Sequence, residues 1–155
     1  MNDKYIGTID EWKRLSDMDL TTAHRIFELF RPMPIEIVCF HAQQAAEKML
    51  KCFLVLNEVE PPYTHNLKLL LDMCAEIESE FSNLEREAIT LSQYGVLPRY
   101  PAELDLEEHD AETALKYADK ITEYANGLVF PPVEEERTTE EENPADEIDG
   151  NEDES

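Results

Sequence analysis

Residues 39–54 read CFHAQQAAEKMLKCFL, and this stretch decides the fold because its apolar and its polar residues both recur at helical spacing. At 100° per residue, one apolar set falls within an arc of roughly 80° and predicts a seam that faces the core. That set comprises Val38, Ala42, Ala45, Met49, Phe53 and Leu56. Gln44, Glu47, Lys48 and Lys51 form a polar stripe on the other side of the same predicted helix. The stretch is therefore expected to be a central amphipathic helix.

The chain before this stretch predicts a first helix. Thr8 followed by Glu11 fits a capping box at its start, and apolar residues then recur at helical spacing up to Phe30. Prolines follow directly, and a helix cannot continue through them. We therefore expect the first helix to end by Phe30 and the central helix to run from about Pro34 to Leu56.

Three more helices are predicted downstream. Thr64 suits the N-cap of a third helix, Ser82 with Glu85 fits a capping box for a fourth, and Gly127 can terminate a fifth. The sequence contains no convincing alternating strand, internal repeat or Gly-rich phosphate loop. These patterns predict an all-α, up-and-down bundle of about five helices over residues 1–130.

Residues 131–155 differ from the rest in composition. They hold twelve acidic residues against one Arg, a contribution of −11, and almost no large apolar residue follows Val133. Such a segment cannot offset its ordering entropy by burial, so we expect a disordered acidic tail. It is either a solubilising extension, or an electrostatic contact for a basic partner or a mimic of nucleic-acid charge.

The overall charge limits the ligand classes. The net charge is −23, so residues 1–130 still carry −12 once the tail's −11 is subtracted. A protein that binds nucleic acid by itself normally shows a basic patch. Either the ligand is small, or a basic partner protein meets the acidic surface; direct nucleic-acid binding is not expected without such a partner.

The cysteines and the start of the chain indicate a cytoplasmic protein without cofactors. Cys39, Cys52 and Cys74 all sit in apolar helical patterns, which is typical of buried thiols in a reducing compartment. No Cys/His spacing suggests a metal site. The opening MNDKYIGTIDEWKRL has no apolar signal-peptide core, and no run reaches the roughly 18 apolar residues of a membrane span.

Four short motifs, in order, give the chain a resemblance to the HEPN family of small helical bundles. The resemblance extends from about Asp17 to Tyr124. The motifs are Asp-x-Asp-Leu at Asp17, Asp19 and Leu20, the Gln-Gln-Ala-x-Glu-Lys type of run in the central helix, Thr-His-x-Leu at Thr64, His65 and Leu67, and Arg-Tyr-Pro at Arg99, Tyr100 and Pro101. The resemblance implies a homodimer that acts as partner of a minimal nucleotidyltransferase, often in a toxin–antitoxin pair. Other members of the family are ribonucleases or are proposed to bind nucleotides.

The motif of the ribonuclease members is absent. In those members an Arg is followed by four to six residues and then a His. After Arg99 the corresponding positions hold Leu104, Asp105 and Leu106, and the next His is His109. The carboxylates in this segment would repel RNA phosphate rather than stabilise its developing charge. We therefore expect no catalytic residues, although a divergent ribonuclease using Arg99 and a His from across a dimer stays open.

Nucleotide binding is the ligand hypothesis that the polar stripe and the resemblance suggest. Lys suits phosphate, Gln can contact a base edge or a ribose hydroxyl, and an aromatic ring can stack on a base. The alternative is a solvated surface, in which Glu47 and Lys51 form an ordinary helical pair worth ~0.2–0.5 kcal/mol. The candidate ligand residues are Gln44, Lys48, Lys51, His65, Arg99 and Tyr100.

A second apolar line on the central helix indicates contacts on more than one side. Phe40, Leu50 and Leu54 lie outside the main seam, and Phe27 and Phe30 of the first helix would lie near Phe40 in an antiparallel hairpin. Enclosure by the third and fourth helices explains most of this line. A homodimer or a partner-docking face explains the rest. A non-catalytic interaction module is thus the leading expectation, and a plain scaffold remains an alternative.

Overall fold

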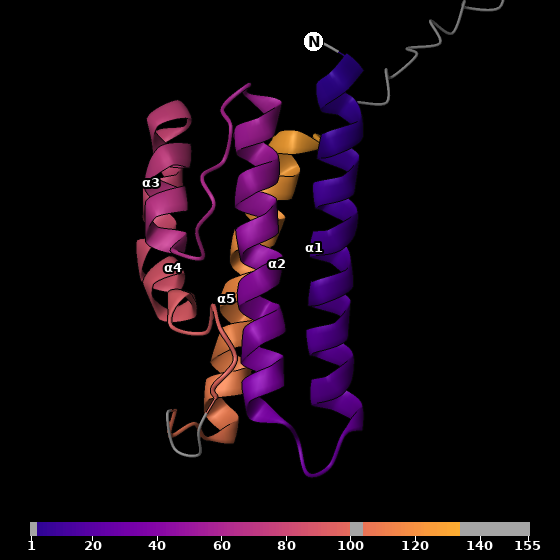
Figure 1. Cartoon of the computed structure of the whole chain (residues 1–155), viewed down its shortest axis with the longest axis vertical. Coiled ribbons are helices and arrows are strands. Elements are labelled where there is room, and N and C mark those ends of the chain that lie inside the picture. Colours follow the sequence, from indigo (N-terminus) through magenta and orange to yellow (C-terminus); the bar gives the residue numbers. More distant parts are fainter. Residues whose placement is uncertain (1–2, 100–103, 134–155) are drawn as a thin grey trace, which may run out of the picture.

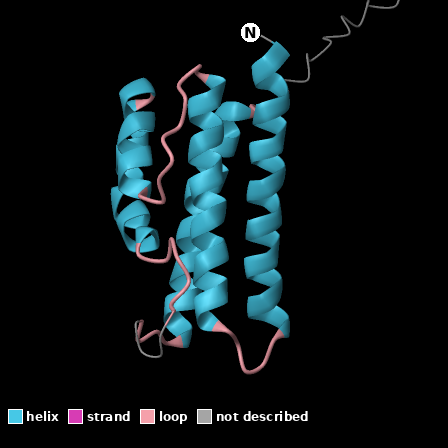
Figure 2. Cartoon of the chain, viewed as in Figure 1, coloured by secondary structure: helices cyan, strands magenta, loops and turns pink. Residues whose placement is uncertain are grey.

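The chain forms a helical bundle in which one helix is surrounded by the others (Figures 1 and 2). The computed structural model describes residues 3–99 and 104–133, and within these ranges no residue forms a strand. The elements are α1 (Asp3–Leu29), α2 (Ile35–Leu56), α3 (Leu67–Ile77), the short 3₁₀ helix η1 (Ser79–Leu84), α4 (Glu85–Ser92) and α5 (Glu108–Val129). The expected all-α bundle of five α-helices is confirmed.

The central position belongs to α2, as its double apolar patterning indicates. It forms a long antiparallel hairpin with α1 and packs along α5 on another side, while α3 and α4 cover a third side (Figure 1). Fourteen of its 22 residues are buried, which leaves no broad solvent-facing stripe. Leu50 and Leu54 are fully buried, so enclosure explains them, whereas Phe40 stays partly exposed.

Two of the expected helix starts are wrong. Thr8 lies inside α1, which already begins at Asp3 and continues through Gly7, since one glycine weakens a helix without ending it. The N-cap of α3 is Asn66, whose side chain accepts a hydrogen bond from the Leu69 amide at 3.1 Å. Thr64 instead accepts from the Asn66 amide at 3.1 Å, and so shapes the turn that leads to the cap.

The expected boundaries of the last two helices also shift. Ser82 lies within η1, which runs directly into α4, and its hydroxyl donates to the Ser79 carbonyl at 2.6 Å. Gly127 does not end α5, because the helix continues to Val129, whose side chain is buried. The cost of about 1 kcal/mol for a glycine within a helix is small beside that burial. The start of α5 is a capping box between Glu107 and Asp110.

The three cysteines are buried and unpaired, as expected. Burial raises the pKa of Cys39, Cys52 and Cys74 from the usual 9.0 to about 12, so all three are protonated thiols at neutral pH. They act as small apolar groups in the core. No helix in the described part of the chain is both long and apolar enough to cross a membrane. The predicted tail lies, from residue 134 onward, outside the described residues.

Candidate functional site

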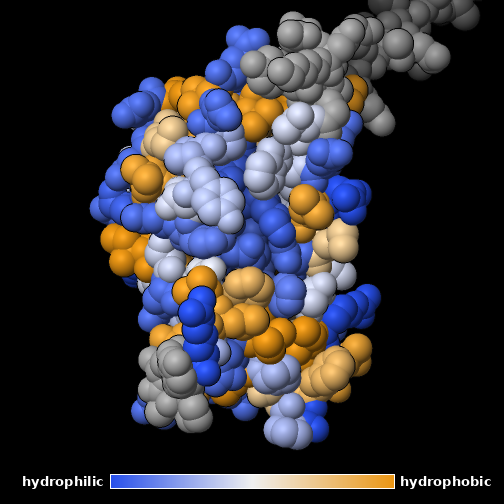
Figure 3. Space-filling view, viewed as in Figure 1, coloured by the Kyte–Doolittle hydropathy of each residue, from blue (hydrophilic) through white to orange (hydrophobic). Residues whose placement is uncertain are grey.

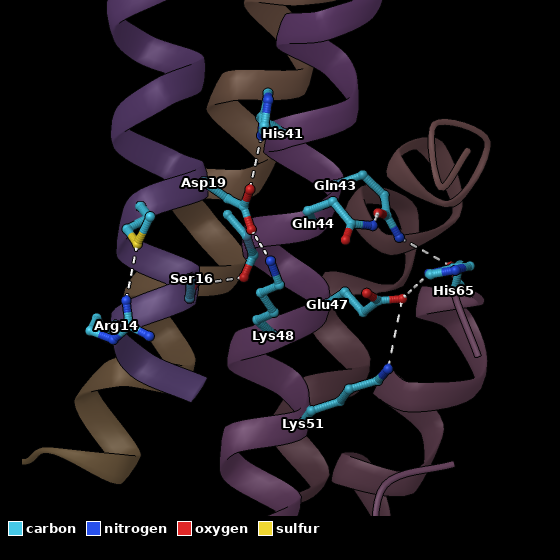
Figure 4. A network of polar contacts seen from close by, with 12 residues as sticks. Arg14, Ser16, Asp19, His41, Gln43, Gln44, Glu47, Lys48, Lys51 and His65 are labelled. Carbon is cyan, nitrogen blue, oxygen red and sulfur yellow. Dashed lines mark hydrogen bonds and ion pairs between the residues drawn. The ribbon is translucent and has the colours of Figure 1, made fainter. Parts of the chain in front are cut away.

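The polar stripe of α2 is built into the bundle rather than turned to solvent. Its side chains make contacts in two directions, towards α1 on one side and towards the segment before α3 on the other (Figure 4). On the α1 side, Asp19 Oδ1 lies 2.8 Å from His41 Nδ1, and Asp19 Oδ2 pairs with the Lys48 ammonium. Ser16, one turn away on α1, donates to the Ala45 carbonyl at 2.8 Å. These contacts tie α1 to α2 across 22 or more residues of sequence.

On the other side of α2, Glu47 organises a second group. Its Oε1 lies 2.7 Å from His65 Nδ1 and 3.9 Å from the Lys51 ammonium (Figure 4). The Gln43 amide donates to the His65 carbonyl at 3.1 Å and accepts from the Gln44 amide at 2.7 Å. The chain is thereby fixed to α2 at His65, just before α3 begins.

Glu47 and Lys51 form the expected i, i+4 pair, but the pair does not lie on a solvated surface. Glu47 is 3% exposed and Lys51 is 7% exposed, so both charges are largely withdrawn from water. The Lys51 ammonium also lies 5.7 Å from the centre of the Trp12 ring on α1. Charged side chains are rarely so buried without a partner, and here each serves as partner of the other.

The structure brings together four of the six candidate ligand residues. Gln44, Lys48 and Lys51 follow one another along α2, and His65 joins them through Glu47, which pairs with both His65 and Lys51 (Figure 4). Arg99 is exposed in the segment after α4. Tyr100 lies outside the described residues, so its part in the candidate site stays a prediction.

Two residues of this cluster, Trp12 and Asp19, were not among the six candidate ligand residues. Trp12, Ser16 and Asp19 recur at i, i+4 and i+7, so they share one face of α1. This spacing could have identified them from the sequence, because in a hairpin one face of the first helix packs against the central helix.

The carboxylate and ammonium charges of this cluster cancel. Asp19 and Glu47 supply two negative charges, and Lys48 and Lys51 supply two positive charges. The cluster therefore offers no excess positive charge to a phosphate. Among the described residues, no group of three or more His, Cys, Asp or Glu side chains is placed to hold a metal ion.

The first histidine after the positions that the ribonuclease motif would use also lies among carboxylates. His109 Nδ1 lies 3.3 Å from Glu107 Oε2, and its Nε2 lies 3.6 Å from Asp110 Oδ1. Both ring nitrogens thus face carboxylates at the start of α5. A phosphate approaching this histidine would meet negative charge on either side.

Gly95 packs closely against His65 in the group around Glu47, and its replacement tests this packing. A Cβ added at Gly95 would lie 2.9 Å from His65 Cβ and 3.5 Å from the Gln43 amide nitrogen. Because real Cβ atoms do not approach so closely, we expect Gly95→Ala to displace His65 and to lower the free energy of unfolding by about 1–2 kcal/mol. Urea unfolding followed by circular dichroism measures the change.

Gly127→Ala is the matched control for that substitution. Gly127 lies within α5, and a Cβ there would meet nothing within 4 Å. Its replacement is expected to stabilise the protein by about 0.5–1 kcal/mol, because alanine loses less backbone entropy in a helix. If both variants shifted stability in the same direction, the close packing of Gly95 on His65 would be refuted.

Comparisons with known proteins agree with this architecture. The family model "HEPN domain" matches residues 9–128. The solved structure of ST0689, an archaeal HEPN homologue, superposes with a TM-score of 0.63 at 23% identity, over 78% of this chain and 97% of that one. TT1696 from Thermus thermophilus gives a TM-score of 0.65 at 26% identity, over 76% of this chain and 95% of that one. A search of curated proteins finds no match. Since the family model spans most of the chain, the protein belongs to the HEPN domain family.

Proposed function

We propose that this HEPN protein is a non-catalytic interaction module that binds a partner protein. The partner we expect is a minimal nucleotidyltransferase in a two-component, toxin–antitoxin-like system. The observation that carries the proposal is an exposed apolar surface at one end of a bundle whose charged cluster is internally neutralised. A homodimer is the other assembly that such a surface would support.

The apolar surface lies at the α1–α2 turn and in the segment after α4. Leu29 and Phe30 are exposed at the end of α1, and Val96 and Leu97 are exposed after α4. Figure 3 shows hydrophobic surface gathering over the lower half of this face, where Figure 1 places both segments. Exposed apolar residues gathered on one face of a protein of high net charge are typical of an interaction site.

The charged residues support a binding role better than a nuclease role. The Arg–His pair of the ribonuclease members is absent after Arg99, and His109 stands among carboxylates. Lys48 and Lys51 are engaged by Asp19 and Glu47, so they add little attraction for RNA. Nucleotide binding remains a prediction from the resemblance.

The experiment is co-purification with the product of the neighbouring gene, which we expect to encode a nucleotidyltransferase. Phe30→Asp places a charge on the apolar surface and is expected to weaken the complex by about tenfold or more, since desolvating an unpaired carboxylate is costly. Ile89→Asp is the matched control, because Ile89 is 53% exposed and lies within α4, outside the two segments that carry the exposed apolar residues. Isothermal titration calorimetry measures both affinities.

Two results would count against the proposal. One is a neighbouring gene of another kind, together with no stable protein partner. The other is equal weakening by Phe30→Asp and Ile89→Asp, which would indicate a non-specific effect of added charge. Light scattering on the isolated protein separately shows whether Phe30→Asp dissociates a homodimer instead.

A further inference from the structure

A hollow lies between α1, the end of α2 and residues 58–63, at some distance along α2 from the apolar end. It consists of two adjoining cavities of about 540 and 500 Å³ that share Trp12, Glu60 and Pro61. Val55, Glu58 and Val59 line the first cavity, while Lys51, Pro62 and Tyr63 line the second. In Figure 1 this segment leaves the end of α2 and descends beside it.

Aromatic and proline rings form much of the wall. Trp12 is partly buried, and Tyr63 is 99% exposed. Pro61 and Pro62 each fix their own φ angle just before Tyr63, so the ring of Tyr63 follows a stiff segment. The ring lies 6.3 Å from that of His65 but buries almost no surface, so it adds little to the stability of the fold, whereas a ligand can stack on it without ordering the backbone.

The charge of the hollow is negative. Glu58 and Glu60 line it, and the lysine at its floor, Lys51, is already neutralised by Glu47. Glu58 has φ = 61°, a left-handed conformation that favours glycine or asparagine. A carboxylate is thus present at a backbone position that disfavours its side chain. An incoming phosphate would be repelled here, and a cation would be attracted.

We propose that this hollow binds the guanidinium group of an arginine in a basic segment of a partner protein. A planar guanidinium can stack on Tyr63, whose ring carries no cation from the described residues, while donating paired hydrogen bonds to Glu58 or Glu60. Lysine offers neither the planar face nor the paired donors. The inference deepens the proposed function, on which it rests for the existence of a protein partner, and it names the chemistry that the partner supplies.

The experiment uses a hexa-arginine peptide and the fluorescence of Trp12, the only tryptophan in the chain. We expect the peptide to change this fluorescence in a saturable way, because Trp12 lines both cavities. The double variant Glu58→Gln with Glu60→Gln should bind about tenfold more weakly, since two charge-assisted contacts lose their charge. Tyr63→Ala should bind about threefold more weakly, without unfolding, because its ring is exposed.

A matched control is needed because a basic peptide is attracted to any acidic protein. Glu112→Gln with Glu123→Gln removes the same charge from exposed positions on α5, which line a different cavity. This control should change the affinity by less than about twofold, as expected for screened surface charges. Equal losses in both double variants would overturn the inference. Hexa-lysine binding as tightly as hexa-arginine would overturn the assignment to arginine.

A parallel titration with ATP distinguishes an arginine site from the nucleotide site that the sequence predicts. ATP that changed Trp12 fluorescence at lower concentration than hexa-arginine would overturn the inference in favour of a nucleotide site at Lys51. Failure of hexa-arginine to bind, with the nucleotidyltransferase still co-purifying, would overturn the arginine site and leave the proposed function intact. Peptide binding that persists when no partner protein is found would contradict the proposed function alone.

Discussion

Replacing Phe81 with alanine is expected to lower the free energy of unfolding by about 3–5 kcal/mol, because it removes a large, fully buried ring. Phe81 projects from η1, and its ring centre lies 4.8 Å from that of Phe53 on α2 and 4.8 Å from that of Tyr124 on α5. The substitution would leave a cavity where three elements meet. A domain of this size has a total stability of only about 5–15 kcal/mol. Urea unfolding followed by circular dichroism measures the loss.

Two companion variants show whether the loss comes from the buried ring. Phe81→Leu keeps most of the apolar volume and should cost less than about 2 kcal/mol. Ile89→Ala truncates a side chain that is 53% exposed on the neighbouring α4, so its effect should stay within about 0.5 kcal/mol. An effect of Phe81→Ala no larger than that of Ile89→Ala would refute the packing of η1 on α2 and α5.

The sequence predicts the long helices well, because apolar residues repeat at helical spacing several times along each of them. The central helix was expected from about Pro34 to Leu56 and is observed as α2 (Ile35–Leu56). Individual cap signals are weaker, because a single Ser or Thr can equally sit inside a helix. Thr8 and Ser82 show this, since one lies in α1 and the other in η1. A 3₁₀ helix of six residues gives too short a pattern to be identified from the sequence.

The sequence predicts that three of the candidate residues share one helix, but it does not predict what surrounds them. Helical spacing grouped Gln44, Lys48 and Lys51 correctly, because these residues share one helix. Their partners come from far along the chain: Asp19 is 29 residues from Lys48, and His65 is 18 residues from Glu47. Only the three-dimensional packing decides whether such a stripe faces water. For the same reason, the burial of a charged pair could not be predicted from the sequence.

The HEPN resemblance is confirmed because it drew on several motifs at once. Each motif is short, yet their order along about a hundred residues constrains the fold. The identity of a partner or a ligand depends on exposed residues, and similar exposed residues occur on many unrelated folds. For that reason the family follows from the chain, while its function remains a proposal.

Replacing Glu47 with leucine is expected to lower the free energy of unfolding by about 2–4 kcal/mol, because it leaves the Lys51 ammonium buried without its carboxylate. Leucine fills similar space, so the loss reflects charge rather than volume. His65 should tolerate the change better, since its side chain is 48% exposed and can bond to water. Thermal and urea unfolding of the variant measure the loss.

The double variant Glu47→Leu with Lys51→Met decides whether this pair serves the fold or a ligand. Because replacing both members of a buried ion pair by apolar groups is often neutral, the second substitution should restore at least about 1 kcal/mol. Restored stability with unchanged affinity for partner and nucleotide would mean that the pair is structural. Restored stability with lost binding would instead show that Lys51 contributes to a ligand site, as its position on the polar stripe first suggested. Failure of Lys51→Met to restore any stability would contradict the coupling between the two charges, despite their burial on adjacent turns of α2.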